Sequence, residues 1–183
     1  MAVQKLRLGA VFHFAMIGTP YGSPVVNVGA SLLPNADTNP AAYTSLGCVF
    51  DGQITRKYIE ETDVCFKGGR YVEVMDKRLV AAMIDISLRE QSPILHRLGW
   101  DVSAAIVDGV AQTPFIGADY VEGWCHLQIE ADDGLPRYTG AFWVRLRPSE
   151  DTKWSKDSTK PAITMEVDLS NVLNTVLFNN IIA

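Results

Sequence analysis

The apolar residue at every second position within the segment 46–100 constrains the fold most. This pattern is clearest from Val80 to Leu88, where every second residue is apolar and polar residues such as Asp85 and Ser87 stand between them. Successive side chains of a β-strand point to opposite faces, so a period of two predicts a strand with one buried face. Shorter strands are expected at 46–50, 53–59, 64–66 and 71–74. The pair Gly68-Gly69 is typical of a hairpin tip between the last two.

One short helix is predicted directly after this strand. Its residues are an N-cap and first-turn pair, three apolar residues on one side and a terminating glycine: Ser92, Pro93, Ile94, Leu95, Leu98 and Gly99. A helix of this length has little stability of its own, so we expect it to dock on the sheet.

Further alternating segments predict more strands. They lie at 9–17, 26–32, 121–130, 138–147 and 163–169. With seven to nine strands and no regular alternation of strands and helices, the fold class is mainly β, an antiparallel sandwich or partly closed barrel with one short flanking α-helix.

The length of the chain suits one domain. Residues 1–183 are enough to bury a substantial core. Two polar stretches predict long loops, one near 34–45 and one near 148–160.

Charge and hydropathy exclude several classes of function. The chain has 16 Lys and Arg against 21 Asp and Glu, a net charge of −5. Such a surface repels phosphate backbones, which disfavours sequence-specific DNA or RNA binding. The longest apolar run, 10–17, is too short to span a membrane. The first residues lack the pattern of a secretion signal, so synthesis in a cytoplasm is expected.

The sequence contains no pattern typical of catalysis. The histidines, His13, His96 and His126, are isolated from one another, and common hydrolase, nucleotide-binding and metalloprotease motifs are absent. We therefore expect no enzyme, no catalytic residues, no cofactor and no metal site.

Cysteine usage favours free thiols. Cys48, Cys65 and Cys125 are an odd number without a paired short spacing, and buried free thiols are the preferred interpretation. A bridge between Cys48 and Cys65 stays open as an alternative.

Two tryptophans fall on the polar face of the 121–147 hairpin. Trp124 and Trp143 could stack on sugars, lie in a subunit contact, or be covered within one subunit. A subunit contact, or cover of the two rings within one subunit, is favoured over sugar binding. The candidate residues for a subunit contact are Trp124, Trp143, Arg145, Pro34, Pro40 and Trp154.

The order of these elements resembles a known family. The run Leu46-Gly47-Cys48-Val49-Phe50-Asp51-Gly52 precedes a strand, then Gly68-Gly69, then the long strand to Leu88, Glu90 and the helix ending at Gly99. The later hairpin, Arg145-Leu146-Arg147-Pro148, the polar loop and the strand at 163–169 follow. This order, over roughly residues 46–180, is similar to that of the major tail tube proteins of tailed bacteriophages.

The resemblance implies a β-sandwich with a flanking helix. It also implies assembly into hexameric rings that stack into a tail tube, a conduit for DNA ejection. The implied partners are other copies of the chain and other tail proteins such as the tape measure, terminator and baseplate. Genomic DNA would pass without specific binding, and no membrane is involved. The location would be the virion tail, after assembly in the host cytoplasm, with the loops at 34–45 and 148–160 as candidates for ring-to-ring contacts.

Other functions remain open. They are another phage structural role, as a tail terminator or head decoration protein, a carbohydrate-binding β-sandwich module, and a β-barrel enzyme.

Overall fold

The computed structural model of the protein describes residues 8–47, 49–88, 94, 120–131, 136–148 and 162–178. The described strands are β1 (Leu8–Met16), β2 (Pro20–Tyr21), β3 (Val26–Asn27), β4 (Thr44–Ser45), β5 (Val49–Lys67), β6 (Arg70–Leu88), β7 (Val121–Ala131), β8 (Pro136–Pro148), β9 (Ala162–Val167) and β10 (Thr175–Phe178). A single-turn 3-10 helix, η1, covers Pro40–Ala42. The prediction of a mainly antiparallel β-fold is confirmed.

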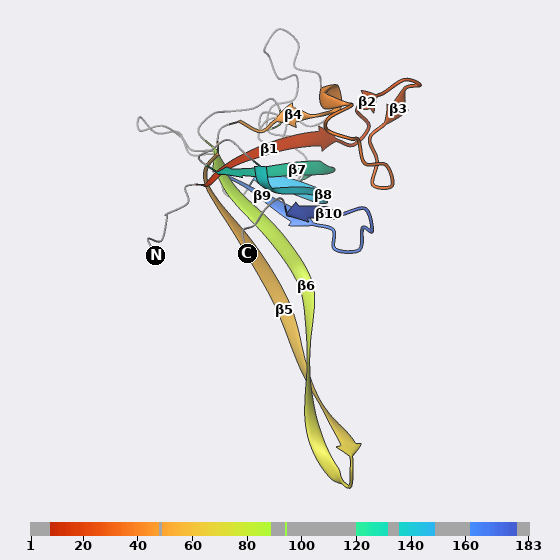
Figure 1. Cartoon of the computed structure of the whole chain (residues 1–183), viewed down its shortest axis with the longest axis vertical. Coiled ribbons are helices and arrows are strands. Elements are labelled where there is room, and N and C mark those ends of the chain that lie inside the picture. Colours follow the sequence, from red (N-terminus) through yellow and green to blue (C-terminus); the bar gives the residue numbers. More distant parts are fainter. Residues whose placement is uncertain are drawn as a thin grey trace.

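Eight of the strands form one antiparallel sheet. Its order is β4-β1-β7-β8-β9-β6-β5. The strand β10 pairs with residues 138–141 of β8, and β9 pairs with residues 144–148 of the same strand. The sheet curls until β1 and β5 are in contact, but these two strands are not hydrogen-bonded to each other and the sheet does not close into a barrel. The strands β2 and β3 form a separate small sheet (Figure 1).

The concave face of the curled sheet holds the main core. Alternate residues of five strands point into it, including Phe12 and Phe14 of β1 and Val144 of β8. The predicted buried positions Ile84, Ile86 and Leu88 of β6 belong to the same cluster and are at most 4% exposed. Because alternation is a local property of strands, it identified this face from the sequence.

A second, smaller core lies on the opposite face of the sheet. It contains Ala15, Val28, Ala42, Trp124 and Trp143. The segment that carries β2, β3 and η1 supplies two of these residues and covers the sheet there. The sheet is therefore covered by residues of the same chain on this part of its outer face.

The loop predicted near 34–45 has regular structure in its second half. It contains η1 and β4, and Thr44 and Ser45 of β4 pair with Phe14 and His13 of β1. Those pairs satisfy backbone hydrogen bonds that a plain loop would leave to water.

Two other predicted elements fall mostly outside the described residues. Of the predicted helix, only Ile94 is described, and its side chain is buried in the main core. The rest of that helix, and residues 149–160 of the predicted second loop, stay predictions.

Candidate assembly surface

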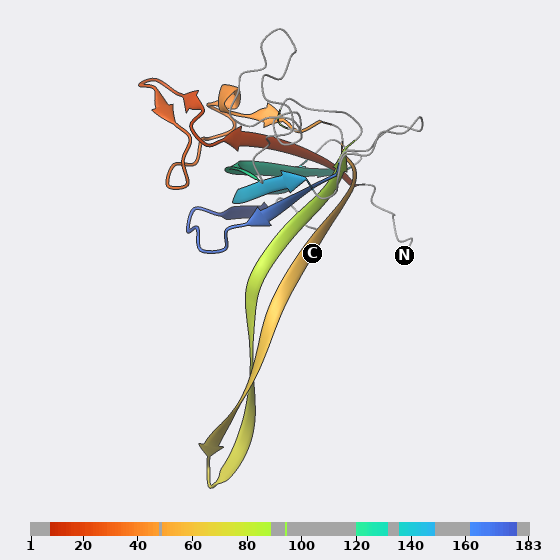
Figure 2. The same ribbon diagram turned by 180° about the vertical axis from the view of Figure 1, so that it is seen from behind.

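The strands β5 and β6 extend far beyond the rest of the sheet. Each is 19 residues long, and together they leave the body as a twisted hairpin (Figures 1 and 2). Residues 82–87 of β6 also pair with β9, whereas among the described strands residues 70–81 pair only with β5. We call residues 58–79 the arm. It has strand neighbours on neither of its edges within the described part of the chain.

The sequence predicted pieces of this hairpin but not the arm. The expected strands at 53–59 and 64–66 are one continuous strand, because β6 pairs with β5 along its whole length. The predicted tip is confirmed: Gly68 and Gly69 form it with φ of +62° and +81°. Positive φ at both central positions matches a type I′ turn, which suits the twist of a hairpin and favours glycine.

A register shift marks the base of the arm. Lys57 pairs with Ala81, but the next residue, Tyr58, pairs with Leu79. Val80 is thus an extra residue on β6, a β-bulge of the kind that bends a strand and increases its twist. The bulge lies where the hairpin separates from the body.

One face of the arm is apolar and open to solvent. Directly paired residues of an antiparallel hairpin share a face, and successive pairs alternate between the two faces. Every second pair, from Tyr58–Leu79 to Phe66–Tyr71, therefore lies on the apolar face. Phe66 is 66% exposed, Tyr71 77% and Met75 67%. The rings of Phe66 and Tyr71 contact edge to face, with centroids 5.2 Å apart. An exposed apolar face of this kind is typical of a protein interaction site.

An ion pair and the exposed residue Glu73, which lies opposite Val64, interrupt the apolar face. The Lys77 ammonium lies 2.8 Å from Glu60 Oε1 and 4.8 Å from the centre of the Tyr58 ring. The hydrogen bond between them lowers the pKa of the Glu60 carboxyl and raises that of Lys77. Both groups are therefore charged around neutral pH and neutralise each other.

The opposite face of the arm is charged. It carries Glu61 opposite Asp76, and Lys67 opposite Arg70 nearer the tip. All four residues are exposed. Cys65 lies between these two pairs and is also exposed. The expectation of a buried thiol was wrong for Cys65, because both sides of the arm face solvent in a single copy.

The other described thiol is buried as expected. Cys125 lies in the main core, and burial raises its pKa to about 12. Cys48 lies outside the described residues, so the Cys48–Cys65 alternative remains untested.

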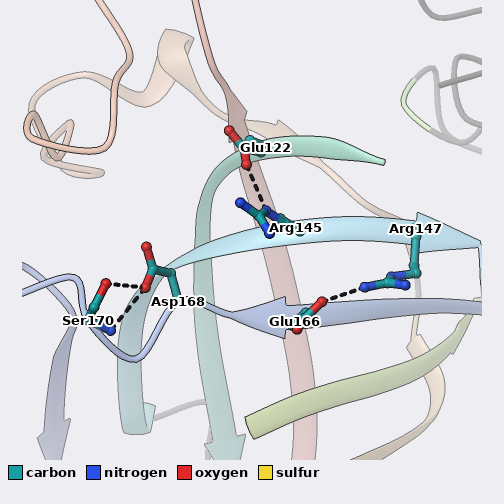
Figure 3. Close-up of polar contacts among 6 residues, drawn as sticks. All are labelled: Glu122, Arg145, Arg147, Glu166, Asp168 and Ser170. Atoms are coloured by element: carbon teal, nitrogen blue, oxygen red, sulfur yellow. Dashed lines mark hydrogen bonds and ion pairs between the residues drawn. The ribbon is translucent and has the colours of Figure 1, made fainter. Parts of the chain in front are cut away.

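A row of charged side chains crosses the outer surface of β7, β8 and β9. Arg145 Nε lies 2.8 Å from Glu122 Oε1, and Arg147 pairs with Glu166, as Figure 3 shows. Asp168, at the end of the row, accepts hydrogen bonds from the hydroxyl and the backbone N–H of Ser170, which lower the pKa of its carboxyl. The predicted contact residue Arg145 is thus exposed but already paired within the chain.

An open depression of about 500 Å³ lies beside this row. Arg145, Glu166, Asp168 and the bulge residue Val80 contribute to its walls. The hydrogen bonds from Ser170 lower the pKa of Asp168, so this carboxylate is a poor candidate for proton transfer. Among the described residues, no group of three or more His, Cys, Asp or Glu side chains could hold a metal ion.

The predicted tryptophan contacts need correction. Trp124 is 0% exposed and Trp143 5%. The structure therefore favours cover within one subunit over sugar stacking or a subunit contact at these two residues. Alternation alone could not show this, because the covering segment is distant in sequence.

Of the two prolines predicted as contact residues, one is buried and the other is exposed. Pro34 is fully buried, where its carbonyl accepts a hydrogen bond from the Tyr43 hydroxyl, whereas Pro40 is exposed at the start of η1. Only Pro40 of the two can meet a partner in this conformation. Trp154 lies outside the described residues.

Two of the histidines are not isolated in the fold. His13 and His126 face each other across β1 and β7, with ring centroids 6.4 Å apart, and the Tyr43 ring lies 6.0 Å from His126. Burial, and then the neighbouring His13, lower the pKa of His126. This pair could not be found by sequence spacing, because its members are 113 positions apart.

Comparisons with known proteins include a structural likeness to a solved assembly. No protein-family model matches the chain, and no curated protein matches it. A solved structure described as the baseplate of the anti-feeding prophage contains a similar chain, with a TM-score of 0.42 and 10% sequence identity over 97% of this chain and 98% of that one. No described helix is both long and apolar enough to cross a membrane.

Proposed function

We propose that this chain is a structural protein that self-assembles through its arm into the rings of a phage tail tube. The observation that carries the proposal is the exposed apolar face of the arm. Residues such as Phe66, Tyr71 and Met75 gain stabilisation when buried, roughly 1.5–3 kcal/mol for each side chain of this size. A single copy leaves that stabilisation unused.

A second copy of the chain is the occupant that fits this surface. The arm adds to its apolar face a row of open backbone groups along β5, to which only β6 is paired in the described structure. Long open strand edges invite pairing with another chain. Each copy offers one arm and one body, and a head-to-tail contact between two different surfaces closes into a ring when it repeats around an axis.

The proposed role in the particle follows from the family resemblance and the charge. Six copies would form each ring, and stacked rings would form a tube that conducts DNA, with other tail proteins at its ends. A net charge of −5 is compatible with passage of DNA without retention. The proposed role is structural and needs no catalytic group or cofactor. Another phage structural role, as tail terminator or head decoration, would use the arm in the same way.

Electron microscopy and size-exclusion chromatography test the proposal on a matched pair of proteins. The native chain is compared with a variant in which residues 58–80 are replaced by Asn-Gly, which joins the paired residues Lys57 and Ala81 by a two-residue turn. None of the described core residues lies in the removed segment, so the variant should fold.

We expect hollow tubes or rings from the native chain at high concentration. The variant should remain a folded monomer, with the circular dichroism of a β-protein. Native protein that stays monomeric at high concentration would refute the proposal, as would tubes from the armless variant. Isolated rings without tubes would favour the terminator alternative.

A further inference from the structure

The charged face of the arm has an arrangement that is unfavourable in a single copy. Glu61 lies directly opposite Asp76, and Lys67 lies directly opposite Arg70. Like charges placed opposite each other destabilise a hairpin. On the apolar face, by contrast, Glu60 lies opposite Lys77 and forms an ion pair. One arm therefore pairs opposite charges on one face and like charges on the other.

The two like-charged pairs have opposite signs and a defined separation. Six positions along each strand separate them, which corresponds to about 20 Å at the usual rise of a strand. Asp63 is on the same face and adds to the acidic middle, whereas Arg78, nearer the base, offsets one of its charges. The middle of the face is thus net negative and the tip positive.

We propose that Lys67 and Arg70 of one arm lie against Glu61 and Asp76 of the arm of a second copy. This inference rests on the proposed self-assembly and specifies the contact that fixes how the arms of two copies align. A second copy is the partner because the same face presents both signs, so each surface is complementary to part of itself. Contacts between exposed charges contribute more to the orientation and rate of association than to its strength. The apolar face, on the opposite side of the hairpin, makes a separate contact in the assembly that supplies most of the affinity.

Charge reversal tests the contact without altering the hairpin. Lys67→Glu with Arg70→Glu makes the tip acidic, and Glu61→Lys with Asp76→Lys makes the middle basic. Each reversal keeps two like charges opposite each other, so the repulsion inside the hairpin is unchanged. A variant with all four changes restores complementarity and the native net charge. Exchanging Glu60 and Lys77 on the apolar face, which preserves their ion pair, is the control.

The readout is the protein concentration at which assemblies form at low salt, measured by light scattering and electron microscopy. Each double variant alone should need at least a tenfold higher concentration than the native chain. The fourfold variant, and an equal mixture of the two double variants, should recover assembly to within about threefold. The control should assemble as the native chain does, and the difference between native and double variants should shrink as salt is added.

The outcomes separate this inference from the proposed function. If the native chain assembles and both double variants assemble equally well, the charged contact is refuted while self-assembly stands. If the double variants fail and the fourfold variant fails too, the two pairs do not contact each other and the inference is again refuted. If the native chain does not assemble at all, both proposals fall.

Discussion

Trp124 of β7 lies directly opposite Trp143 of β8, with ring centroids 5.5 Å apart and planes inclined by 72°. This edge-to-face contact forms the centre of the outer core. The indole N–H of Trp124 donates a hydrogen bond to the Gly29 carbonyl at 2.9 Å. The pair therefore joins the segment that carries β2 and β3 to the main sheet.

Removing the Trp124 ring should strongly destabilise the body. Trp124→Ala deletes a fully buried ring and its hydrogen bond, and we expect a loss of about 3–5 kcal/mol in the free energy of unfolding. Trp124→Phe keeps most of the apolar contact and should lose less. Urea unfolding measures both. Val172→Ala, at a residue that is 92% exposed, is the control and should change stability by less than about 0.5 kcal/mol. Equal effects at the two sites would contradict the burial of Trp124.

Gly123 should tolerate no side chain. A Cβ at this position would lie 2.2 Å from the Ala15 carbonyl oxygen and 2.7 Å from Cζ of Phe14. The backbone of β1 or β7 would have to move, so Gly123→Ala should cost at least about 2 kcal/mol in a thermal or urea unfolding experiment. Gly52→Ala is the matched control, since its nearest side-chain neighbour, Cγ2 of Ile86, would be 3.6 Å from the new Cβ. The prediction fails if both variants are equally stable.

The two tip glycines should respond differently to substitution. Gly68→Asn should preserve the turn, because Asn accepts a positive φ and Asn-Gly is the preferred type I′ pair. Gly69→Val should strain the turn by about 1–2 kcal/mol, because a β-branched residue resists that conformation. Hydrogen exchange of arm amides measures the effect locally. Faster exchange should be confined to the arm, and faster exchange in β7 or β8 would show that the arm and body unfold together.

Stability should fall as the pH drops through the titration of His126. Its folded-state pKa is lowered, first by burial and then by His13, so the unfolded chain binds a proton more readily below about pH 6.5. The contribution of neutral His126 to the free energy of unfolding is therefore complete at pH 7.5. It is lost as the pH falls towards the lowered folded-state pKa of His126. Asp37 opposes the shift, and Tyr43 contacts the same ring.

The variant His126→Gln isolates this contribution. Urea unfolding at pH 7.5 and at pH 5.5 should show a smaller decrease for the variant than for the native chain. The same decrease in both proteins would assign the pH dependence to other groups.

The described cysteines should differ in reactivity. Cys65 is exposed on the arm, whereas Cys125 is buried with its pKa raised to about 12, so it holds almost no thiolate at neutral pH. Iodoacetamide applied to the native protein, followed by peptide mass mapping, should modify Cys65 and leave Cys125 unmodified until denaturant is added. Rapid modification of Cys125 in the native protein would contradict its place in the core.

Much of the strand pattern could be predicted, because alternation is written into consecutive residues. The faces of β1 and of the β7–β8 hairpin follow directly from it, and so does the tip at Gly68-Gly69. The gap left between the expected strands 46–50 and 53–59 was wrong, because Asp51-Gly52 lies inside β5. Its backbone pairs with Ser87 and Ile86 of β6, and these cross-strand bonds override the local preference.

The candidate surface was only partly predictable. Trp124 and Trp143 were predicted as possible contact residues because they are large apolar groups in polar positions of the sequence. The arm was not predicted, although it is the best candidate for the assembly surface. Its alternating apolar residues look like those of a strand that packs on a core. Nothing in their order distinguishes a buried face from one that projects into solvent.

The sequence by itself determined where most of the long strands lie, which of their residues share a face and where the long hairpin turns, since these depend on neighbours two positions apart. The strand expected at 26–32 was wrong beyond Asn27, where β3 ends. Only the tertiary structure decided which faces are covered. The segment that contains Gly29, whose carbonyl bonds Trp124 across 95 positions, covers the indoles, while beyond the bulge at Val80 the arm pairs with no other described strand. Burial depends on contacts between distant segments, and local periodicity contains no information about them.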